Sequence, residues 1–352
     1  MLMETLSDFG AVQHLAVDTF TTGVYRTWFA LGSPEGAARL ASMLLLIMFV
    51  VLIVEQRSRG RAKYYQITGR TEKKEKIKLK GFQGILAAIV CFIPVLFGFV
   101  VPAGYLLVLS LPNWTNVLAS KFPTHLWNSF SLALLTSVVA TLCALFVVYS
   151  LRLTRSRLNR LAVRVVSLGY GLPGSVIAVG VLIPMAWLDH VVDGFMRSTF
   201  GYSTGLIFTG GLLSLMFAYL VRFMAISLNS VQSSMDALAP RMDEAAKSLG
   251  AGIWRRLFVI HIPLLSSGLL TGMLLVFVDV MKELPATLIL RPFNYDTLAV
   301  KAYEFASDEA LSESACYALT IVAVGLIPVI LLSRSVLGFG YGSARMRIED
   351  EK

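Results

Sequence analysis

Three charged residues, Asp279, Lys282 and Glu283, stand at the end of a long apolar run of the sequence. If that run crosses a membrane, charge at this depth is costly unless it is paired or exposed to water. On a helix, the spacing places Lys282 and Glu283 beside Asp279, which favours a local ion pair. The other interpretation is that Asp279 and Glu283 line an aqueous gate, where their carboxylates would draw a cation inward.

A second group of polar residues, Tyr295, Asp296, Tyr303 and Glu304, lies a short distance further along the chain. Phenolate and carboxylate oxygens are hard ligands of the kind that ferric iron prefers. The simpler interpretation is that these are polar residues on a solvated loop. We therefore expect no metal ligands in this chain.

The cysteines and histidines do not form a site by their spacing. They are scattered, and the cysteines lie in or beside apolar segments, so neither a disulfide framework nor a zinc site is predicted. The chain has no H-E-x-x-H motif and no G-x-x-x-x-G-K-[ST] phosphate loop. We expect no catalytic residues, no cofactor and no ATP hydrolysis by this chain, which disfavours a membrane enzyme. The cysteines are Cys91, Cys143 and Cys316, and the histidines are His14, His125, His190 and His261.

Composition defines the elements that must position these residues. Of the 352 residues, 56% are hydrophobic and only 15% are charged, with a mean hydropathy of +0.70. These values predict an all-α, polytopic membrane protein with about seven transmembrane helices. The predicted spans are residues 37–54, 84–109, 130–151, 165–188, 206–228, 264–280 and 315–332.

Basic residues between the spans set the expected topology. Residues 55–82 and 152–164 are rich in lysine and arginine, so both loops are expected in the cytoplasm and residues 112–126 outside. We therefore interpret the net charge of +9 as a set of basic residues that fix the topology and contact lipid, and we expect no nucleic-acid partner. Arg222, near the inner end of its span, is expected to be a snorkelling anchor.

The polar loop of residues 235–263 is the most distinctive stretch of the chain. Pro240 suits the first turn of a helix, and Gly250 stands where a left-handed stop is expected. A second helix is expected over residues 253–262, and Pro263 marks the entry into the next apolar span. The first helix carries an apolar stripe at i, i+3, i+4 and i+7, formed by Met242, Ala245, Ala246 and Leu249.

This loop resembles the EAA loop of ABC importer permeases. The family pattern is E-A-A, three residues, G, nine residues, then I-x-L-P, and Ile262 replaces the usual leucine. The resemblance implies a coupling helix that inserts into a groove on a separate ATPase subunit, which acts as a dimer. The matching residues are Glu244, Ala245, Ala246, Gly250, Ile260 and Pro263.

Residues 3–29 and 281–306 resemble segments of ferric-iron ABC importer permeases. The resemblance implies a type I (MetI-like) permease in the bacterial inner membrane, which moves ferric iron delivered by a periplasmic ferric-iron-binding protein. Thiamine, phosphonate and polyamine permeases share this architecture and stay open as alternatives. A stand-alone secondary transporter or channel is an alternative of another class, but it would need no EAA loop and would carry charge near mid-span.

An internal repeat relates residues 3–54 to residues 281–332 at a constant shift. It suggests two homologous permease halves. We expect residues 1–54 to be the end of a first half and residues 55–83 to be a basic cytoplasmic linker. Residues 84–337 would then form a six-helix half, and residues 338–352 a cytoplasmic tail. The shared permease core is expected over about residues 126–333. A first half encoded elsewhere, or a second copy of this chain, would then complete the permease.

Overall fold

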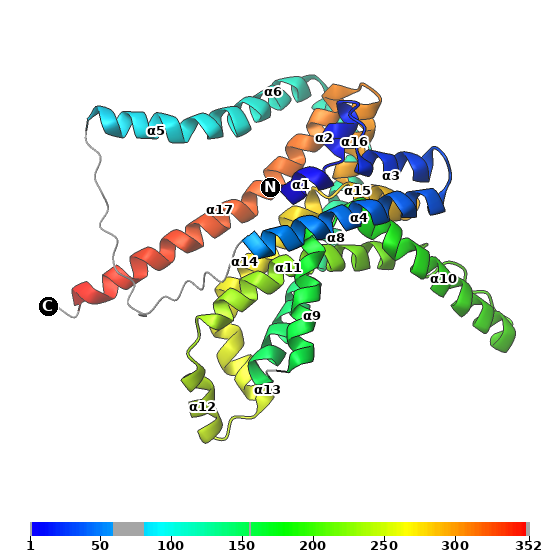
Figure 1. The fold of residues 1–352 in the computed structure, drawn as a ribbon. Coiled ribbons are helices and arrows are strands. Elements are labelled where there is room, and N and C mark those ends of the chain that lie inside the picture. The colour runs from blue at the N-terminus through cyan, green and yellow to red at the C-terminus, as the bar shows by residue number, and fades with distance from the viewer. Residues whose placement is uncertain (1, 59–80, 155, 350–352) are drawn as a thin grey trace.

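The apolar runs of the sequence form helices throughout the computed structural model, which describes residues 2–58, 81–154 and 156–349 (Figure 1). No strand occurs in these ranges, so the predicted all-α class is confirmed. The elements are α1 (Leu2–Ser7), α2 (Gly10–His14), α3 (Phe20–Phe29), α4 (Pro34–Ser58), α5 (Phe82–Val95), η1 (Leu96–Val100), α6 (Val101–Ser110), η2 (Leu111–Asn113), α7 (Trp114–Ala119), α8 (Phe122–Leu153), α9 (Arg157–Leu168), η3 (Gly169–Gly171), α10 (Gly174–Phe200), α11 (Leu213–Asp236), α12 (Pro240–Ser248), α13 (Ile253–Arg255), η4 (Arg256–His261), α14 (Ile262–Met281), α15 (Pro285–Leu290), α16 (Leu298–Ser307) and α17 (Leu311–Glu349).

Seven helical segments in the described ranges are long and apolar enough to cross a membrane, which agrees with the predicted number. Most of the predicted basic loop lies in residues 59–80, outside the described residues. Helix α17 continues to Glu349, so the segment predicted as a tail is helical up to that residue. The seven segments are Pro34–Val54, Phe82–Ala119, Phe122–Leu153, Gly174–Phe200, Leu213–Asp236, Ile253–Met281 and Leu311–Ser333.

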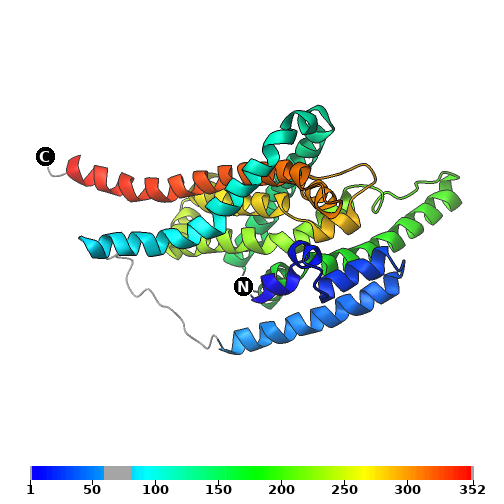
Figure 2. The same ribbon diagram turned by 90° about the horizontal axis from the view of Figure 1, so that it is seen from above.

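Helices α8, α11 and α14 form the centre of the fold, each packed along the other two. Small side chains on α8, including Ala133, Ala140 and Ala144, are fully buried, which lets neighbouring helices approach closely. Helices α4 and α17 lie on opposite sides of this bundle (Figure 2). Figure 1 places α12 at one end of the bundle and α15 and α16 towards the other.

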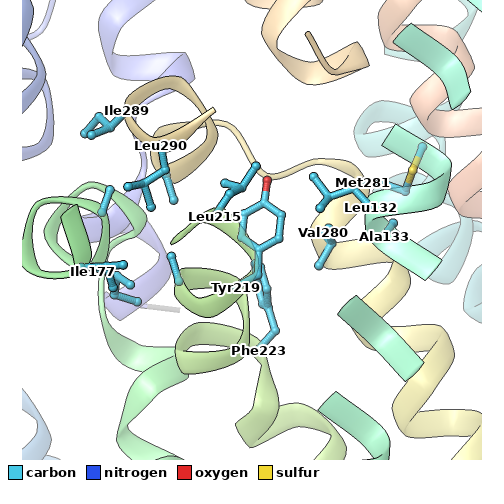
Figure 3. Close-up of a cluster of buried hydrophobic side chains, with 14 of the residues drawn as sticks. Leu132, Ala133, Ile177, Leu215, Tyr219, Phe223, Val280, Met281, Ile289 and Leu290 are labelled. Atoms are coloured by element: carbon cyan, nitrogen blue, oxygen red, sulfur yellow. The ribbon is translucent and has the colours of Figure 1, made fainter. Parts of the chain in front are cut away.

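A buried apolar cluster joins the bundle to α10 and α15 (Figure 3). Tyr219 of α11 lies at its centre and is 1% exposed, and Phe223 of the same helix packs against it. The Tyr219 hydroxyl lies 2.6 Å from Thr287 Oγ1 of α15, so its polar end is satisfied inside the core. The cluster therefore fixes the short helix α15 against the membrane-spanning helices.

The predicted span over residues 165–188 was wrong in its boundaries. Its first part belongs to α9 and η3, and the spanning helix α10 begins only at Gly174, after Pro173 as N-cap. A proline disfavours the helical conformation in the residue before it, so the chain breaks here although its hydropathy stays high. The next span also begins later than predicted, at Leu213, because residues 201–212 form a loop.

That loop is tied down by two aspartates of α10. The carboxylate of Asp189 accepts hydrogen bonds from the backbone N–H groups of Phe208 and Thr209, at 2.8 and 2.9 Å. Asp193 accepts hydrogen bonds in the same way from the N–H groups of Thr204 and Gly205. The residues counted as the start of a span are therefore held as an irregular turn beside the end of α10.

The predicted external segment, residues 112–126, is largely helical. It contains part of η2, all of α7 and the first turn of α8. The indole N–H of Trp114 donates to Ser110 Oγ at 3.2 Å, and Trp127 is 67% exposed. Both tryptophans thus remain near the end of a span, as interfacial aromatic residues do.

Two short helices of the fold recur at the shift of the repeat predicted from the sequence. Helices α3 and α16 have the same length and begin at residues 20 and 298, a shift of 278 residues. Thr19 and Thr297 precede them, and each side chain accepts a hydrogen bond from the N–H group three residues on. Each of these helices then packs against the long helix that follows it, α4 or α17.

Candidate functional site

The predicted coupling loop contains the helix and the stop that its sequence indicates. Helix α12 has Pro240 in its first turn and is followed by Gly250 with φ of +77°. The N–H of Ala251 donates to the carbonyl of Ala246, which closes the helix end. The predicted second helix differs, because one α-helical turn, α13, passes through the π-helical turn η4 directly into α14.

The residues that match the EAA pattern divide into an exposed and an inward-facing set. Glu244, Ala245 and Gly250 are exposed, whereas Ala246 is buried. Ile260 is half-buried and Pro263 is exposed. Leu249, the last residue of the predicted apolar stripe, is 85% exposed. The stripe therefore does not pack fully against this chain, and part of it is free to contact another protein.

Asp243, which directly precedes the motif, anchors the loop, a role that was not predicted from the sequence. Its Oδ2 accepts a hydrogen bond from Arg152 Nε at 2.8 Å, and its Oδ1 accepts one from His261 Nε2 at 2.8 Å. Although burial pulls the pKa of Asp243 upward, the hydrogen bonds from Arg152 and His261 hold it below its usual range. His261, a polar residue directly before an apolar span, is the sequence signal that could have pointed to this contact.

Arg152 extends the same connection to the backbone. Its Nη1 donates to the carbonyl of Met235, and its Nη2 donates to those of Leu238 and Ala239. These carbonyls lie at the end of α11 and in the turn before α12. Because Arg152 belongs to the predicted basic loop 152–164, this contact places that loop at the same end of the bundle as the coupling loop.

A buried ion pair lies in the opposite half of the same bundle, between Arg222 of α11 and Glu283. Arg222 Nη1 donates to Glu283 Oε1 at 2.8 Å, and the two side chains are 16% and 2% exposed. The prediction that Arg222 snorkels to a surface is corrected here, and Glu283, expected either in a local ion pair or at a gate, has Arg222 as its partner. The physical reason is that each charge has a partner within the protein.

The N-terminus of α15 provides further partners for Glu283. The carboxylate accepts hydrogen bonds from the N–H groups of Ala286 and Thr287, both at 3.0 Å, and from Thr287 Oγ1 at 2.7 Å. Gly174, at the start of α10, lies against both members of the pair, since a Cβ there would be 2.3 Å from Arg222 Nη1. The pair therefore joins α10, α11 and α15.

Asp279 forms the local ion pair that its spacing favours. Lys282 Nζ lies 2.8 Å from Asp279 Oδ1, and the lysine side chain is 62% exposed. Asp279, Lys282, Arg222 and Glu283 all line a cavity of about 500 Å³, which Thr5, Ser7 and Asp8 close from the side of the first segment. The carboxylates thus stand beside a cavity, and a gating role for Asp279 and Glu283 stays a prediction.

The polar residues after α15 form an ion-pair network, which corrects the expected solvated loop. Arg291 and Lys301 each pair with both Asp296 and Glu304, and the four side chains are between 19% and 35% exposed. Positive charge already satisfies both carboxylates at this point. Across the described ranges, no group of three or more histidine, cysteine, aspartate or glutamate side chains is arranged to hold a metal ion.

The two nearby tyrosines have other partners. Tyr295 donates to the carbonyl of Asn128 at 3.1 Å. Tyr303 packs edge-on against Tyr25, its counterpart in the repeat, with ring centroids 6.4 Å apart. Burial and the neighbouring Tyr303 raise the pKa of Tyr25 to about 12. Tyr25 therefore stays a neutral phenol at neutral pH.

The family follows from comparison with known sequences. Residues 137–339 match the family described as binding-protein-dependent transport system inner membrane components, and this region contains the coupling loop and the buried ion pair. The chain belongs to this family of permease subunits, and with seven apolar helices it is a multi-pass protein of the bacterial inner membrane.

Particular relatives within the family differ in what their names say they carry. The Fe(3+)-transport system permease protein FbpB 2 of Haemophilus influenzae is 25% identical over 338 residues. That match covers 94% of this chain but 63% of the relative, so the chain spans less than two thirds of that protein. A Salmonella typhimurium protein named for 2-aminoethylphosphonate transport, PhnV, is 23% identical over 67% of this chain and 81% of its own length.

Two further comparisons bear on the fold and on the range of names. The molybdenum transport system permease protein ModB of Haemophilus influenzae is 28% identical over 46% of this chain and 68% of its own length. Among solved structures, a bacterial alginate ABC transporter, in complex with an alginate-bound periplasmic protein, has a chain with a TM-score of 0.55 and 13% identity. It covers 71% of this chain and 91% of its own, and it shows the likeness of the folds.

Proposed function

We propose that this chain is a permease subunit of an ATP-driven importer, and that it moves ferric iron, delivered by a periplasmic binding protein, across the inner membrane. The observation that supports the substrate is the similarity to FbpB 2 over 94% of the chain. That match extends beyond residues 137–339 to most of the N-terminal segment, residues 1–54, in which α2 packs against α16. The matches to PhnV and ModB support the alternatives of a phosphonate or an oxyanion substrate.

The coupling loop supports an ATPase partner. Helix α12 lies at an end of the bundle, with Glu244, Ala245 and Leu249 exposed (Figure 1). A short helix with small side chains can lie deep in a groove of another protein, because its backbone approaches the groove walls closely. In this proposal, the groove belongs to the ATPase, and movement of α12 is the signal that opens the permease.

The cavity beside Asp279 supports a path for the substrate. It lies between the first segment of the chain and the bundle, and it is lined by both acidic and basic side chains. Within this proposal, Asp279 and Glu283 contribute negative charge to the path, while Arg222 and Lys282 keep the two carboxylates paired in the conformation described here.

Uptake in cells tests the substrate. The chain is expressed with its neighbouring ATPase and binding protein in cells that lack their own ferric importers, and radiolabelled ferric iron is supplied. We expect accumulation that depends on ATP and on the binding protein and that excess 2-aminoethylphosphonate or molybdate does not reduce. Uptake of either of those anions in place of iron would contradict the ferric assignment while leaving the importer class intact.

The stop at Gly250 gives a matched test of the coupling loop. A Cβ at Gly250 or at Gly252 would meet nothing within 4 Å, but only Gly250 has a positive φ. A β-branched residue is strongly disfavoured at positive φ. We therefore expect Gly250→Val to reduce ATPase co-purification and uptake by about tenfold or more, as about 1.4 kcal/mol of strain would do, and Gly252→Val to retain both. Equal behaviour of the two variants would contradict the role assigned to this stop.

A further inference from the structure

Helix α12 is joined to the bundle by one carboxylate that contacts two different helices. Asp243 accepts one hydrogen bond from Arg152, at the end of α8, and one from His261, in the turn that leads into α14, each at 2.8 Å. The guanidinium of Arg256 approaches the same carboxylate at 3.9 Å. Helices α8 and α14 are two of the three central helices, so Asp243 connects the coupling helix directly to the centre of the fold.

The partners of Asp243 are themselves held in place. His261 is fully buried, and its ring lies against that of Tyr149, with centroids 5.3 Å apart. The Tyr149 hydroxyl donates to the carbonyl of Ile253 at 2.7 Å, which fixes the turn before η4. Arg152 is also bonded to three backbone carbonyls. If α12 moved while α8 and α14 stayed in place, these charged, hydrogen-bonded groups would be separated from their partners.

The EAA residues do not make a comparable connection. Glu244 and Ala245 are exposed, and Ala246 offers one methyl group to the interior. Apolar contact of this size permits sliding, whereas hydrogen bonds to a charged group fix both distance and direction. The docking surface and the connection to the bundle are therefore carried by different residues of the same short helix.

We propose that Asp243 is the positioning residue of the coupling helix, which locks α12 to α8 and α14 through Arg152 and His261. When the ATPase shifts α12, the lock makes these two helices move with it. This inference rests on the proposed function for its purpose, but the lock itself is a property of this chain. Its carboxylate remains charged at neutral pH, because the two hydrogen bonds hold the pKa of Asp243 below its usual range.

A distance measurement on the chain alone tests the lock. Spin labels are placed at Leu153 of α8 and Lys247 of α12, both exposed, after the three cysteines have been replaced. We expect a narrow distance distribution in the parent and in the control Asp236→Asn, an exposed aspartate at the end of α11. We expect a clearly broader distribution in Asp243→Asn. If the distance distributions of Asp243→Asn and Asp236→Asn had equal widths, the proposed lock would be wrong, whatever the ATPase does.

Transport measurements then test its use. In membranes containing the ATPase and the binding protein, Asp243→Asn should retain the ATPase and its ATP hydrolysis, while substrate moved per ATP falls about tenfold, as expected for losing a hydrogen bond to a charged group. The losses caused by Asp243→Asn and Arg152→Gln should add up to more than the loss in the double variant, because both changes remove the same contact, although Arg152→Gln also removes bonds to three backbone carbonyls. Unchanged transport per ATP, or loss of ATPase retention in Asp243→Asn alone, would overturn the proposal. Failure of the parent to retain any ATPase would instead contradict the proposed function, and the label distances would still decide on the lock.

Discussion

Glu283→Ala is expected to destabilise the folded protein by about 3–5 kcal/mol, the range measured when one partner of a buried ion pair is removed. The change leaves the Arg222 guanidinium, 16% exposed, without its carboxylate. It also leaves the N–H groups of Ala286 and Thr287 without their acceptor at the start of α15. We expect a clear fall in the thermal midpoint of the purified protein and in the yield of folded protein in the membrane.

Asp279→Ala is the matched control for that change. It removes a carboxylate four residues away that also lines the cavity, but its partner Lys282 is 62% exposed. Exposed pairs contribute about 0–1 kcal/mol, so the thermal midpoint should barely change. If Glu283→Ala and Asp279→Ala proved equally mild, the buried pair would not hold α10, α11 and α15 together as described.

A double variant separates charge from packing at the same place. Replacing both charges, with Arg222→Met and Glu283→Gln, leaves no uncompensated charge in the interior, and the glutamine oxygen can still accept from an N–H of α15. We expect this double variant to be more stable than Glu283→Ala, because an unpaired buried charge costs more than the pair contributes. A double variant that was less stable than Glu283→Ala would contradict this assignment of the cost.

Local features of the fold could be predicted from sequence because they depend on neighbouring residues. The stop at Gly250 was expected from one glycine after an apolar stripe, and the structure gives it a φ of +77°. The ion pair between Asp279 and Lys282 follows from helical spacing alone. The repeat was visible for the same reason, since the chain around Thr19 and Thr297 carries the same local signals for a capped helix.

The connections that define the site could not be predicted in this way, because their partners are distant in the sequence. Arg222 and Glu283 are 61 residues apart, and Arg152 and Asp243 are 91 apart. Read singly, Arg222 suggested a surface anchor, Glu283 a local ion pair or a gate, and Arg152 a basic cytoplasmic loop. Only the fold shows that each has a partner. The break before α10 was missed for another reason, because hydropathy stays high across Pro173 while the backbone cannot continue.

Gly169→Ala is expected to have the next largest effect on stability after the loss of the ion pair. Gly169 lies in η3, and a Cβ at this position would come 1.9 Å from the backbone carbonyl oxygen of Val221. A backbone atom cannot rotate away as a side chain does, so α11 or the segment before α10 must shift. Overpacking of a core costs about 1–3 kcal/mol and occasionally more. We expect the upper part of that range, measured as a lower thermal midpoint.

Gly180→Ala provides the control within the same region. Gly180 lies inside α10, where an added Cβ would meet nothing within 4 Å. Alanine is favoured over glycine in a helix by about 1 kcal/mol, so this variant should be as stable as the parent or slightly more stable. Equal destabilisation by the two alanines would show that the close approach to Val221 is not what Gly169 provides.

The position of Val221 links this test to the ion pair. Val221 directly precedes Arg222, so a shift of α11 that relieves the clash at residue 169 also moves the guanidinium relative to Glu283. Residues that share a backbone shift have non-additive effects on stability. We therefore expect the combination of Gly169→Ala and Glu283→Ala to cost less than the sum of the two single changes. Strict additivity of the measured free energies would mean that the contact at Gly169 and the buried pair are independent.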